Sequence, residues 1–269
     1  MTNSRLNLYL TKDLQGHETE HSAYHDTTLD SPIMSSLVAA ANLIPPSCMK
    51  ILDVGCAMGI FGRLIKKLDP KKHLTGIEFV PEAAKKAKEV LDEIVIVDLD
   101  TFDSLPFPYG FFDCIAALDV IEHLPRPART LSKLLPYLSP SGVLVCSIPN
   151  ILHHTTISQL LLAQRFTNDA VTAWHHLKFW SFEEIVEFIS SLGLQIEEPV
   201  IGTTAPPPPL FEAILQLADL HFAPLYRSLP KDVHIYQYVF RCAKTSGSVP
   251  IQRNFSPEMQ FIPNTVMKV

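Results

Sequence analysis

The sequence lacks a long hydrophobic segment: no apolar run approaches the roughly 20 residues that a membrane-spanning helix needs. The amino end, Met1-Thr-Asn-Ser-Arg-Leu6, also lacks the apolar core of a secretion signal. Both absences argue against export and against membrane insertion. We therefore predict a cytoplasmic protein without a membrane span.

Cysteine pairs are missing as well. The five cysteines are widely spaced, and no Cys-x-x-Cys pair occurs among them. An odd count at such spacing argues against a disulfide framework and against a structural zinc site. Cys114 and Cys146 fall in expected buried strands, where a thiol serves as a small apolar filler.

The chain also has no excess of positive charge. It contains 22 Lys and Arg against 28 Asp and Glu, which gives a formal net charge of −6. A protein that binds extended phosphate backbones needs clustered basic residues, so nucleic acid is not a favoured partner. With 269 residues and 47% hydrophobic content, the chain can bury the core of one large domain.

Only 10 glycines occur, but three of them lie in the most informative segment, Ile51 to Gly62. There a short apolar run containing Asp53 is followed by Gly55 and Gly59. Glycines at such spacing permit a tight strand-to-helix turn and the close approach of a ligand to the main chain. A carboxylate inside this turn suits a ligand with a positive group, such as the ammonium of an amino acid.

Acids stand at the ends of the next expected strands. Residues 74–77, 94–97 and 112–118 read as short strands, and they end at Glu78, Asp98 and Asp119. Strands alternate with helices through residue 148, which predicts an α/β fold with a parallel sheet. Ligands of such sheets bind along the carboxyl edge, and an acid about 20 residues beyond a glycine turn is placed for ribose hydroxyls.

These motifs together resemble the class I S-adenosylmethionine (SAM)-dependent methyltransferases. The resemblance covers about residues 45–200 and rests on six segments in chain order: 53–59, 76–78, 98–99, 112–115, 118–124 and 138–150. One position departs from the family pattern, because Ala57 replaces the middle glycine, which is the smallest possible change. The alternative is a nicotinamide or flavin site, but it requires Gly-x-Gly-x-x-Gly, which this spacing does not match.

The resemblance implies a Rossmann-like α/β fold: a seven-stranded sheet of order 3-2-1-4-5-7-6, with strand 7 antiparallel, helices on both faces and a small lid insertion. We expect an N-terminal segment, 1–44, that includes a capping helix at about 32–43. The methyltransferase domain would follow at 45–245, with lid or substrate insertions at about 151–180 and 202–230. Residues 246–269 read as a loose tail.

The resemblance also implies S-adenosyl-L-methionine as the cofactor. Asp53, Gly55 and Gly59 would hold its methionine part, Glu78 its ribose, and Asp98 with Leu99 its adenine. The predicted cofactor site is completed by Cys56, Ala57, Phe79, Leu118 and Asp119.

Candidate catalytic residues follow the fourth strand. In Asp119-Val-Ile-Glu122-His123 the two acids and the histidine would share one face if the segment forms a helical turn. A later segment, His176-Leu-Lys-Phe-Trp180, is similar to a signature that follows the fifth strand in several small-molecule methyltransferases. We therefore select Glu122, His123 and His176 as the catalytic candidates.

Three interpretations of this cluster remain open. His123 or His176 could act as a general base, because an imidazole titrates near neutral pH. A divalent metal held by Asp119, Glu122, His123 and His176 is a less favoured alternative, which resembles the magnesium site of small-RNA 2′-O-methyltransferases. In a purely structural interpretation, Glu122 and His123 cap the next helix and His176 satisfies a buried partner.

The tandem histidines, His153-His154 and His175-His176, also suggest metal binding. Adjacent residues on a helix or strand point apart, so each pair is expected to offer only one member to a common centre.

The sequence thus predicts a SAM-dependent methyltransferase that acts on a small-molecule acceptor at oxygen, such as a sugar, a quinone precursor or another secondary metabolite. Two alternatives stay open: a catalytically silent SAM-binding regulatory or scaffold protein, and an RNA ribose 2′-O-methyltransferase. Neither the acceptor nor the oligomeric state can be read from the sequence.

Overall fold

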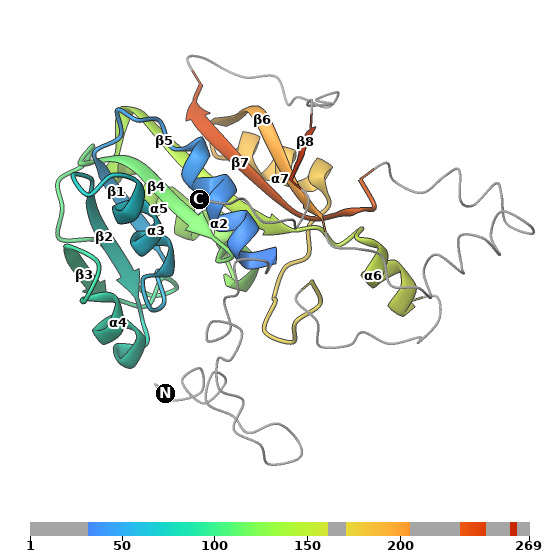
Figure 1. Ribbon diagram of the computed structural model, residues 1–269, viewed down its shortest axis with the longest axis horizontal. Coiled ribbons are helices and arrows are strands. Elements are labelled where there is room, and N and C mark those ends of the chain that lie inside the picture. Colours follow the sequence, from blue (N-terminus) through green and yellow to red (C-terminus); the bar gives the residue numbers. More distant parts are fainter. Residues whose placement is uncertain (1–31, 161–170, 205–231, 246–258, 263–269) are drawn as a thin grey trace, which may run out of the picture.

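The computed structural model describes residues 32–160, 171–204, 232–245 and 259–262 (Figure 1). Residues 1–31 of the predicted N-terminal segment lie outside the described residues, as do residues 161–170 and 205–230 of the two predicted insertions.

A single sheet of mixed direction organises the described part of the chain (Figure 1). Its strand order is β3-β2-β1-β4-β5-β7-β6-β8, with β7 antiparallel to both β5 and β6. The predicted order 3-2-1-4-5-7-6 with an antiparallel strand 7 is therefore confirmed. The strands are β1 Lys50–Val54, β2 His73–Glu78, β3 Glu93–Ile96, β4 Phe112–Leu118, β5 Leu138–Pro149, β6 Leu194–Thr204, β7 Ile235–Lys244 and β8 Met259–Ile262.

The eighth strand corrects the prediction of a loose tail for residues 246–269. Strand β8 pairs in parallel with β6, from Val200↔Met259 to Thr203↔Ile262. The edge of a sheet presents unpaired main-chain donors and acceptors, and β8 satisfies those of β6. Strand β8 has only four residues, which are too few for a period of two to stand out in the sequence.

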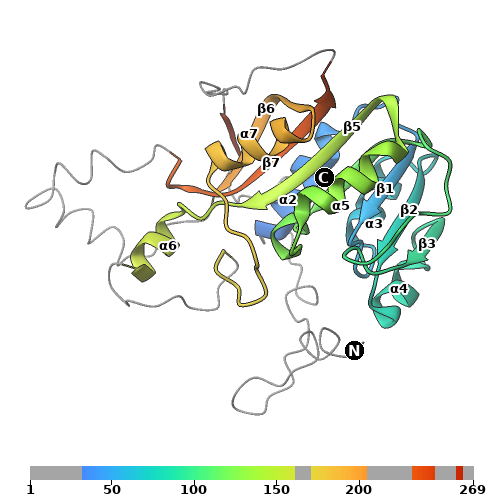
Figure 2. The ribbon, with the colours of Figure 1, turned by 180° about the vertical axis from the view of Figure 1, so that it is seen from behind.

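Helices cover both faces of the sheet, as predicted (Figures 1 and 2). Leu37 of α2 and Ile65 of α3 belong to the buried cluster on one face, whereas Leu131 of α5 and Ile185 of α7 belong to the cluster on the other. The helices are α2 Pro32–Leu43, α3 Ile60–Leu68, α4 Pro81–Ala87, α5 Pro127–Leu134, α6 His154–Ser158 and α7 Phe182–Ser191, with 3-10 turns η2 Ile121–His123 and η3 Leu135–Tyr137.

Local signals set several boundaries. Helix α5 ends at Leu134, and the turn η3, which contains Pro136, follows it. Ser181 and Glu184 form a capping box at the start of α7. Gly193, with φ of +72°, follows α7 and allows the chain to turn into β6.

Candidate functional site

The turn between β1 and α3 is built from left-handed backbone. Gly55, Ala57 and Gly59 have φ values of +69°, +45° and +78°. Alanine at such a φ is strained by roughly 1–2 kcal/mol, whereas glycine adopts it freely. A Cβ on Gly55 would lie 2.7 Å from Cγ2 of Val120, so the turn packs tightly against the segment that follows β4.

Glu78, at the end of β2, holds this turn in place. Its Oε2 accepts a hydrogen bond from the Ala57 N–H at 2.9 Å, and its Oε1 accepts from the N–H groups of Phe79 and Val80, each at 2.9 Å. The Val97 N–H donates to the Glu78 carbonyl at 3.1 Å, which brings the end of β3 alongside. The residue predicted to bind ribose is thus oriented by the main chain.

Asp53, in β1, is buried and lies beside Glu78. Within the described residues its Oδ2 has no hydrogen-bond partner. Burial, together with the charge of Glu78, raises the pKa of Asp53 to about 7. A buried acid without a partner is costly. A positive group on a ligand would supply that partner, so this turn fits the ammonium of the SAM methionine part.

The other predicted cofactor residues lie along the same edge. Asp98 and Leu99 form the turn after β3, where Asp98 Oδ1 accepts from the Asp100 N–H at 2.9 Å. Cys56 is buried in the glycine turn, and its N–H donates to the Ile77 carbonyl at 3.0 Å. Leu118 is the last residue of β4. The carboxyl edges of β1 to β4 therefore bring the predicted cofactor residues together.

Asp119 follows β4 and has φ of +54°, a left-handed conformation unusual for a non-glycine residue. Its Oδ1 accepts hydrogen bonds from Ser147 Oγ, at 2.8 Å, and from the Gln237 side-chain amide. Its own N–H donates to Ser147 Oγ at 2.9 Å. Burial raises the pKa of Asp119 to about 6, while the bonds from Ser147 and Gln237 oppose that shift.

Glu122 lies in the turn η2, with a side chain that is 1% exposed. Neither carboxylate oxygen has a hydrogen-bond partner in the described part of the chain. Burial and the charge of Asp119 raise the pKa of Glu122 well above its usual range. The Glu122 carbonyl accepts from the N–H groups of Leu177 and Lys178 at 2.8 and 3.0 Å, which fastens that segment over the end of β4.

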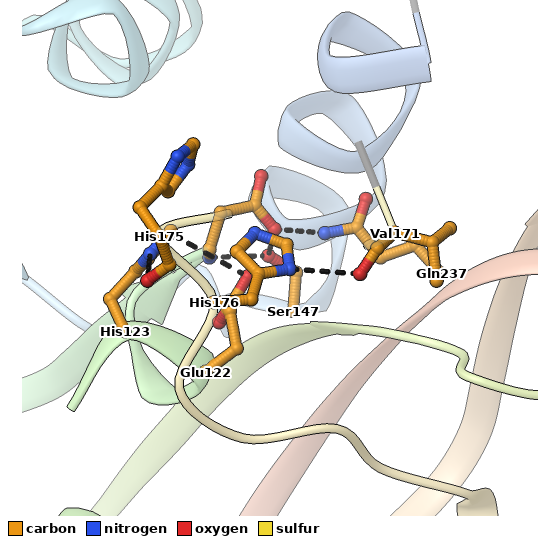
Figure 3. Close-up of polar contacts among 8 residues, drawn as sticks. Glu122, His123, Ser147, Val171, His175, His176 and Gln237 are labelled. Atoms are coloured by element: carbon orange, nitrogen blue, oxygen red, sulfur yellow. Dashed lines mark hydrogen bonds and ion pairs between the residues drawn. The ribbon is translucent and has the colours of Figure 1, made fainter. Parts of the chain in front are cut away.

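Three histidines lie close together at the turn η2 (Figure 3). The His123 ring centroid lies 4.9 Å from that of His175 and 4.7 Å from that of His176. One nitrogen of each ring can be chosen so that all three lie within 4.8 Å of one another. Figure 3 shows His123 and His176 beside Glu122. The predicted catalytic candidates Glu122, His123 and His176 are therefore neighbours in the structure.

Backbone carbonyls orient two of these rings. His123 Nδ1 lies 3.3 Å from the His175 carbonyl, and His176 Nδ1 lies 3.0 Å from the Val171 carbonyl. If each Nδ1 carries the proton and donates, Nε2 of each neutral ring is an acceptor. His123 Nε2 lies 4.0 Å from Glu122 Oε1. This arrangement can receive a proton from a hydroxyl group or bind a cation.

His175 corrects the expectation that a tandem pair offers only one member to a common centre. That expectation holds for helices and strands, but residues 174–179 form neither, so His175 and His176 can both face His123. Their ring centroids are 5.2 Å apart, with perpendicular planes. The sequence reasoning missed His175, although its position next to His176 was the available signal.

The other tandem pair does not join this cluster. His153 and His154 are both fully buried, with ring centroids 3.8 Å apart. Burial, with the nearby His154 and His234, lowers the pKa of His153 to about 3, so that ring stays neutral. Among the described residues, the one grouping with metal-ligand geometry is formed by His123, His175 and His176.

The structural interpretation is wrong in one respect. Helix α5 begins at Pro127, and its N-cap residue is Arg126, whose side chain makes no capping hydrogen bond. Glu122 and His123 therefore do not serve as its cap.

Fold and site together define a class I methyltransferase architecture with a SAM-type turn. The family description "Methyltransferase domain" matches residues 28–198. The chain therefore belongs to the methyltransferase domain family, whose members of this class use SAM.

Curated relatives carry quinone-related names. The chain is 29% identical over 153 residues to 2-methyl-6-phytyl-1,4-hydroquinone methyltransferase from Synechocystis, a match that covers 56% of this chain and 48% of the relative. It is 26% identical over 173 residues to the ubiquinone biosynthesis O-methyltransferase of Xanthomonas axonopodis, covering 62% and 71%. The chain thus spans about half the length of the first relative.

Solved structures show the same fold. A SAM-dependent methyltransferase from Thermotoga maritima aligns with a TM-score of 0.58 at 17% identity, over 84% of this chain and 96% of that one. The plantazolicin methyltransferase BpumL, solved with S-adenosylhomocysteine (SAH), aligns with a TM-score of 0.54 at 18% identity, over 84% and 89%.

Within the described residues, no helix combines the length and hydropathy that crossing a bilayer demands.

Proposed function

We propose that this protein transfers a methyl group from SAM to an oxygen atom of a small-molecule acceptor. One observation carries the proposal. Asp53 Oδ2 has no hydrogen-bond partner among the described residues, and the turn just after Asp53 packs directly against Val120, two residues before Glu122 and three before His123. A cofactor site and a proton-accepting cluster thus adjoin at one edge of the sheet, as methyl transfer to a hydroxyl group requires.

The residues present suit each part of the cofactor. Asp53 and the amide-lined turn at Gly55 and Gly59 would hold the methionine part, because an unpartnered carboxylate attracts an ammonium group. Glu78 would accept from ribose hydroxyls with its remaining lone pairs, and Asp98 with Leu99 would contact adenine. When bound, SAM supplies an electrophilic methyl group on a sulfonium.

His123 or His176 would take the proton from the acceptor hydroxyl. Hydrogen bonds to backbone carbonyls orient both rings, and Glu122 lies beside His123. The three nitrogens within 4.8 Å of one another favour a second way to acidify the acceptor, by a divalent metal that His123, His175 and His176 would ligate. Metal dependence of the rate separates these two chemistries.

Exposed apolar side chains on the segment that carries His175 and His176 suggest the kind of acceptor. Trp174, Leu177 and Phe179 are 49%, 49% and 44% exposed. Such side chains suit a substrate with an apolar part. The names of the relatives, a phytyl hydroquinone and a ubiquinone precursor, support a phenolic acceptor with an apolar tail.

Charge and cysteine chemistry support the remaining assignments. The net charge of −6 gives little attraction for an RNA backbone, so a small molecule is the better-supported acceptor. All five cysteines are buried free thiols. Free thiols are typical of a reducing compartment, which supports the cytoplasm as the location.

The test compares binding with turnover. SAM affinity is measured by calorimetry, and methylation of phenolic acceptors is measured with and without chelator. His123→Ala should keep the SAM affinity but lower the rate about 10²–10⁴-fold, as loss of a general base does. His73→Ala, at an exposed site, is the control. SAM binding without turnover on any acceptor would favour the scaffold alternative, and loss of turnover with chelator would favour the metal.

A further inference from the structure

Two buried polar side chains near the site have no role in the function proposed so far. Ser147 lies on β5 and Gln237 on β7, and they are 0% and 3% exposed. Ser147 pairs with Leu118 of β4, and Gln237 pairs with Pro149 of β5. Both side chains therefore reach the carboxyl end of β4 from the strands on its far side. Figure 3 shows Gln237 on the opposite side of the close-up from His123 and His175, with Ser147 between them.

Both side chains donate to the same carboxylate oxygen. Ser147 Oγ donates to Asp119 Oδ1 and accepts from the Asp119 N–H, so the two residues close a reciprocal pair. The Gln237 amide donates to the same Oδ1. Thr203 Oγ1, on β6, donates to the Gln237 carbonyl at 3.4 Å, which ties the backbone of Gln237 to the next strand. This network spans four strands of the sheet.

Asp119 needs such support. Its φ of +54° is a conformation that an L-residue adopts only when its surroundings hold it there. Hydrogen bonds donated to a carboxylate stabilise its ionised form. Glu122, three residues on, receives no such bond within the described residues. Of these two acids, Asp119 is therefore the one that the protein prepares to carry charge.

Asp119 also lies beside the glycine turn, where the positive groups of SAM would bind. Its neighbour Val120 contacts Gly55 of the glycine turn, and Ala117 of β4 pairs with Val54 of β1. Asp53 and Asp119 thus flank the same turn from adjacent strands. The methionine part of SAM carries two positive groups, the ammonium and the sulfonium, besides its carboxylate. Each of the two flanking carboxylates would therefore face one positive group.

We propose that Ser147 and Gln237 are positioning residues, which hold the ionised Asp119 toward the sulfonium of SAM. The inference rests on the proposed function, since it takes SAM as the ligand. Ser147 and Gln237 would act on the cofactor only through Asp119. Their loss should therefore weaken the binding of a sulfonium more than the binding of the uncharged thioether in SAH.

The test measures the dissociation constants of both SAM and SAH. Gln237→Met keeps the length of the side chain but removes the donor, and Ser147→Ala removes the hydroxyl. A hydrogen bond to a charged group corresponds to about 10-fold or more in affinity. We expect each variant to raise the Kd of SAM about 10-fold and that of SAH no more than about 2-fold. Gln195→Met, at an exposed position of β6, is the matched control and should change neither.

An equal loss of SAM and SAH affinity would overturn the proposal, because a merely structural role disturbs both ligands alike. Unchanged affinities for both would overturn it as well. Ser147→Thr retains the hydroxyl and should recover most of the SAM preference, which guards against a variant that simply folds poorly. Thermal melting of every variant checks folding directly.

A ligand-free readout separates this inference from the proposed function. If the wild-type protein binds neither SAM nor SAH, the proposed function fails, and the assignment to a sulfonium fails with it. The positioning of Asp119 is then still decided by crystal structures of the wild type and of Gln237→Met. A changed χ1 or φ of Asp119 in the variant supports positioning, and an unmoved Asp119 overturns it.

Discussion

Two pairs of acids stand at the carboxyl edge of the sheet: Asp53 and Glu78 in the cofactor half, and Asp119 and Glu122 in the acceptor half. Each pair is divided in the same way. In the cofactor half, Glu78 accepts from three main-chain N–H groups, whereas Asp53 Oδ2 has no partner among the described residues. In the acceptor half, Asp119 accepts from two side chains, whereas Glu122 accepts no hydrogen bond within the described residues. In each half, one acid therefore accepts hydrogen bonds from the protein, and the other is available to bind a ligand or a proton.

The pairs differ in what supports the bonded acid. The donors to Glu78 are amides of its own turn and of the glycine turn 21 residues earlier. The donors to Asp119 are side chains 28 and 118 residues away. Main-chain donors survive most substitutions, but side-chain donors can be removed one at a time. The cofactor half is thus the more robust, and the acceptor half is the easier to retune by mutation.

The largest expected effect concerns Asp53, the unbonded acid of the cofactor half. Its pKa of about 7 in the folded protein exceeds the ordinary value of 3.8, so between these pH values the folded state binds the extra proton. The stability that this proton supplies is complete below about pH 4 and is lost as pH rises through about 7. Asp53→Asn should remove this loss, and its advantage in unfolding free energy should grow to about 2–4 kcal/mol by pH 8.

Denaturant unfolding of the ligand-free protein from pH 4 to pH 8 measures this difference. Asp119 and Glu122 shift stability in the same direction, and His153, with its lowered pKa, shifts it in the opposite one. Subtracting the wild-type curve from that of the variant isolates Asp53. Asp103→Asn, at a fully exposed site, should run parallel to the wild type. Parallel curves for Asp53→Asn would contradict the buried-acid account.

The second-largest expected effect concerns Glu78, the acid of the cofactor half that accepts hydrogen bonds from the main chain. Glu78→Gln keeps the shape, but its amide nitrogen cannot accept, so at least one of the three main-chain donors loses its partner. A buried donor without a partner costs about 1–3 kcal/mol. The melting temperature should fall accordingly, while Glu89→Gln, at an exposed position, should leave it unchanged. An unchanged melting temperature for Glu78→Gln would show that the turn does not need these bonds.

The same exchange in the acceptor half should behave differently. Glu122→Gln replaces an acid that accepts no hydrogen bond among the described residues and whose pKa burial and Asp119 have raised. Because no bonded donor is left unsatisfied, we expect a change within about 1 kcal/mol at pH 7. Chemical denaturation beside Glu183→Gln, an exposed control, measures it. A loss as large as that of Glu78→Gln would erase the difference between bonded and unbonded acids.

The cofactor half could be predicted from the sequence because its signals are short-range. The run Ile51–Val54, the glycines at 55 and 59 and the acid at Glu78 fall within 30 residues, and strand and turn chemistry links them directly. The structure brings all of them to one edge. Glu78 was expected to bind ribose, but its support of the glycine turn needed atomic positions to be recognised.

The acceptor half could be predicted only in part. Glu122 and His123 follow a strand end, which is a local signal. Ser147 meets Asp119 because β5 pairs with β4, and Gln237 meets it because β7 inserts between β5 and β6. No pattern of period 2 or 3.6 encodes that meeting. His175 was missed because its neighbour His176 was expected to exclude it, an argument that fails in an irregular segment.

The smallest expected effect concerns Ala57, the one departure from the glycine pattern in the turn. At φ of +45° its Cβ is strained, and Ala57→Gly removes that strain, while the less restricted unfolded chain offsets part of the gain. The N–H that donates to Glu78 is retained. We expect a gain of about 0.5 kcal/mol in unfolding free energy. Ala128→Gly, at an exposed position of α5, should instead lose about 0.5–1 kcal/mol, because glycine is a poor helix former. Opposite signs for one chemical exchange would show that the backbone conformation of the turn decides the outcome, and a loss at both positions would mean that Ala57 is relaxed where it stands.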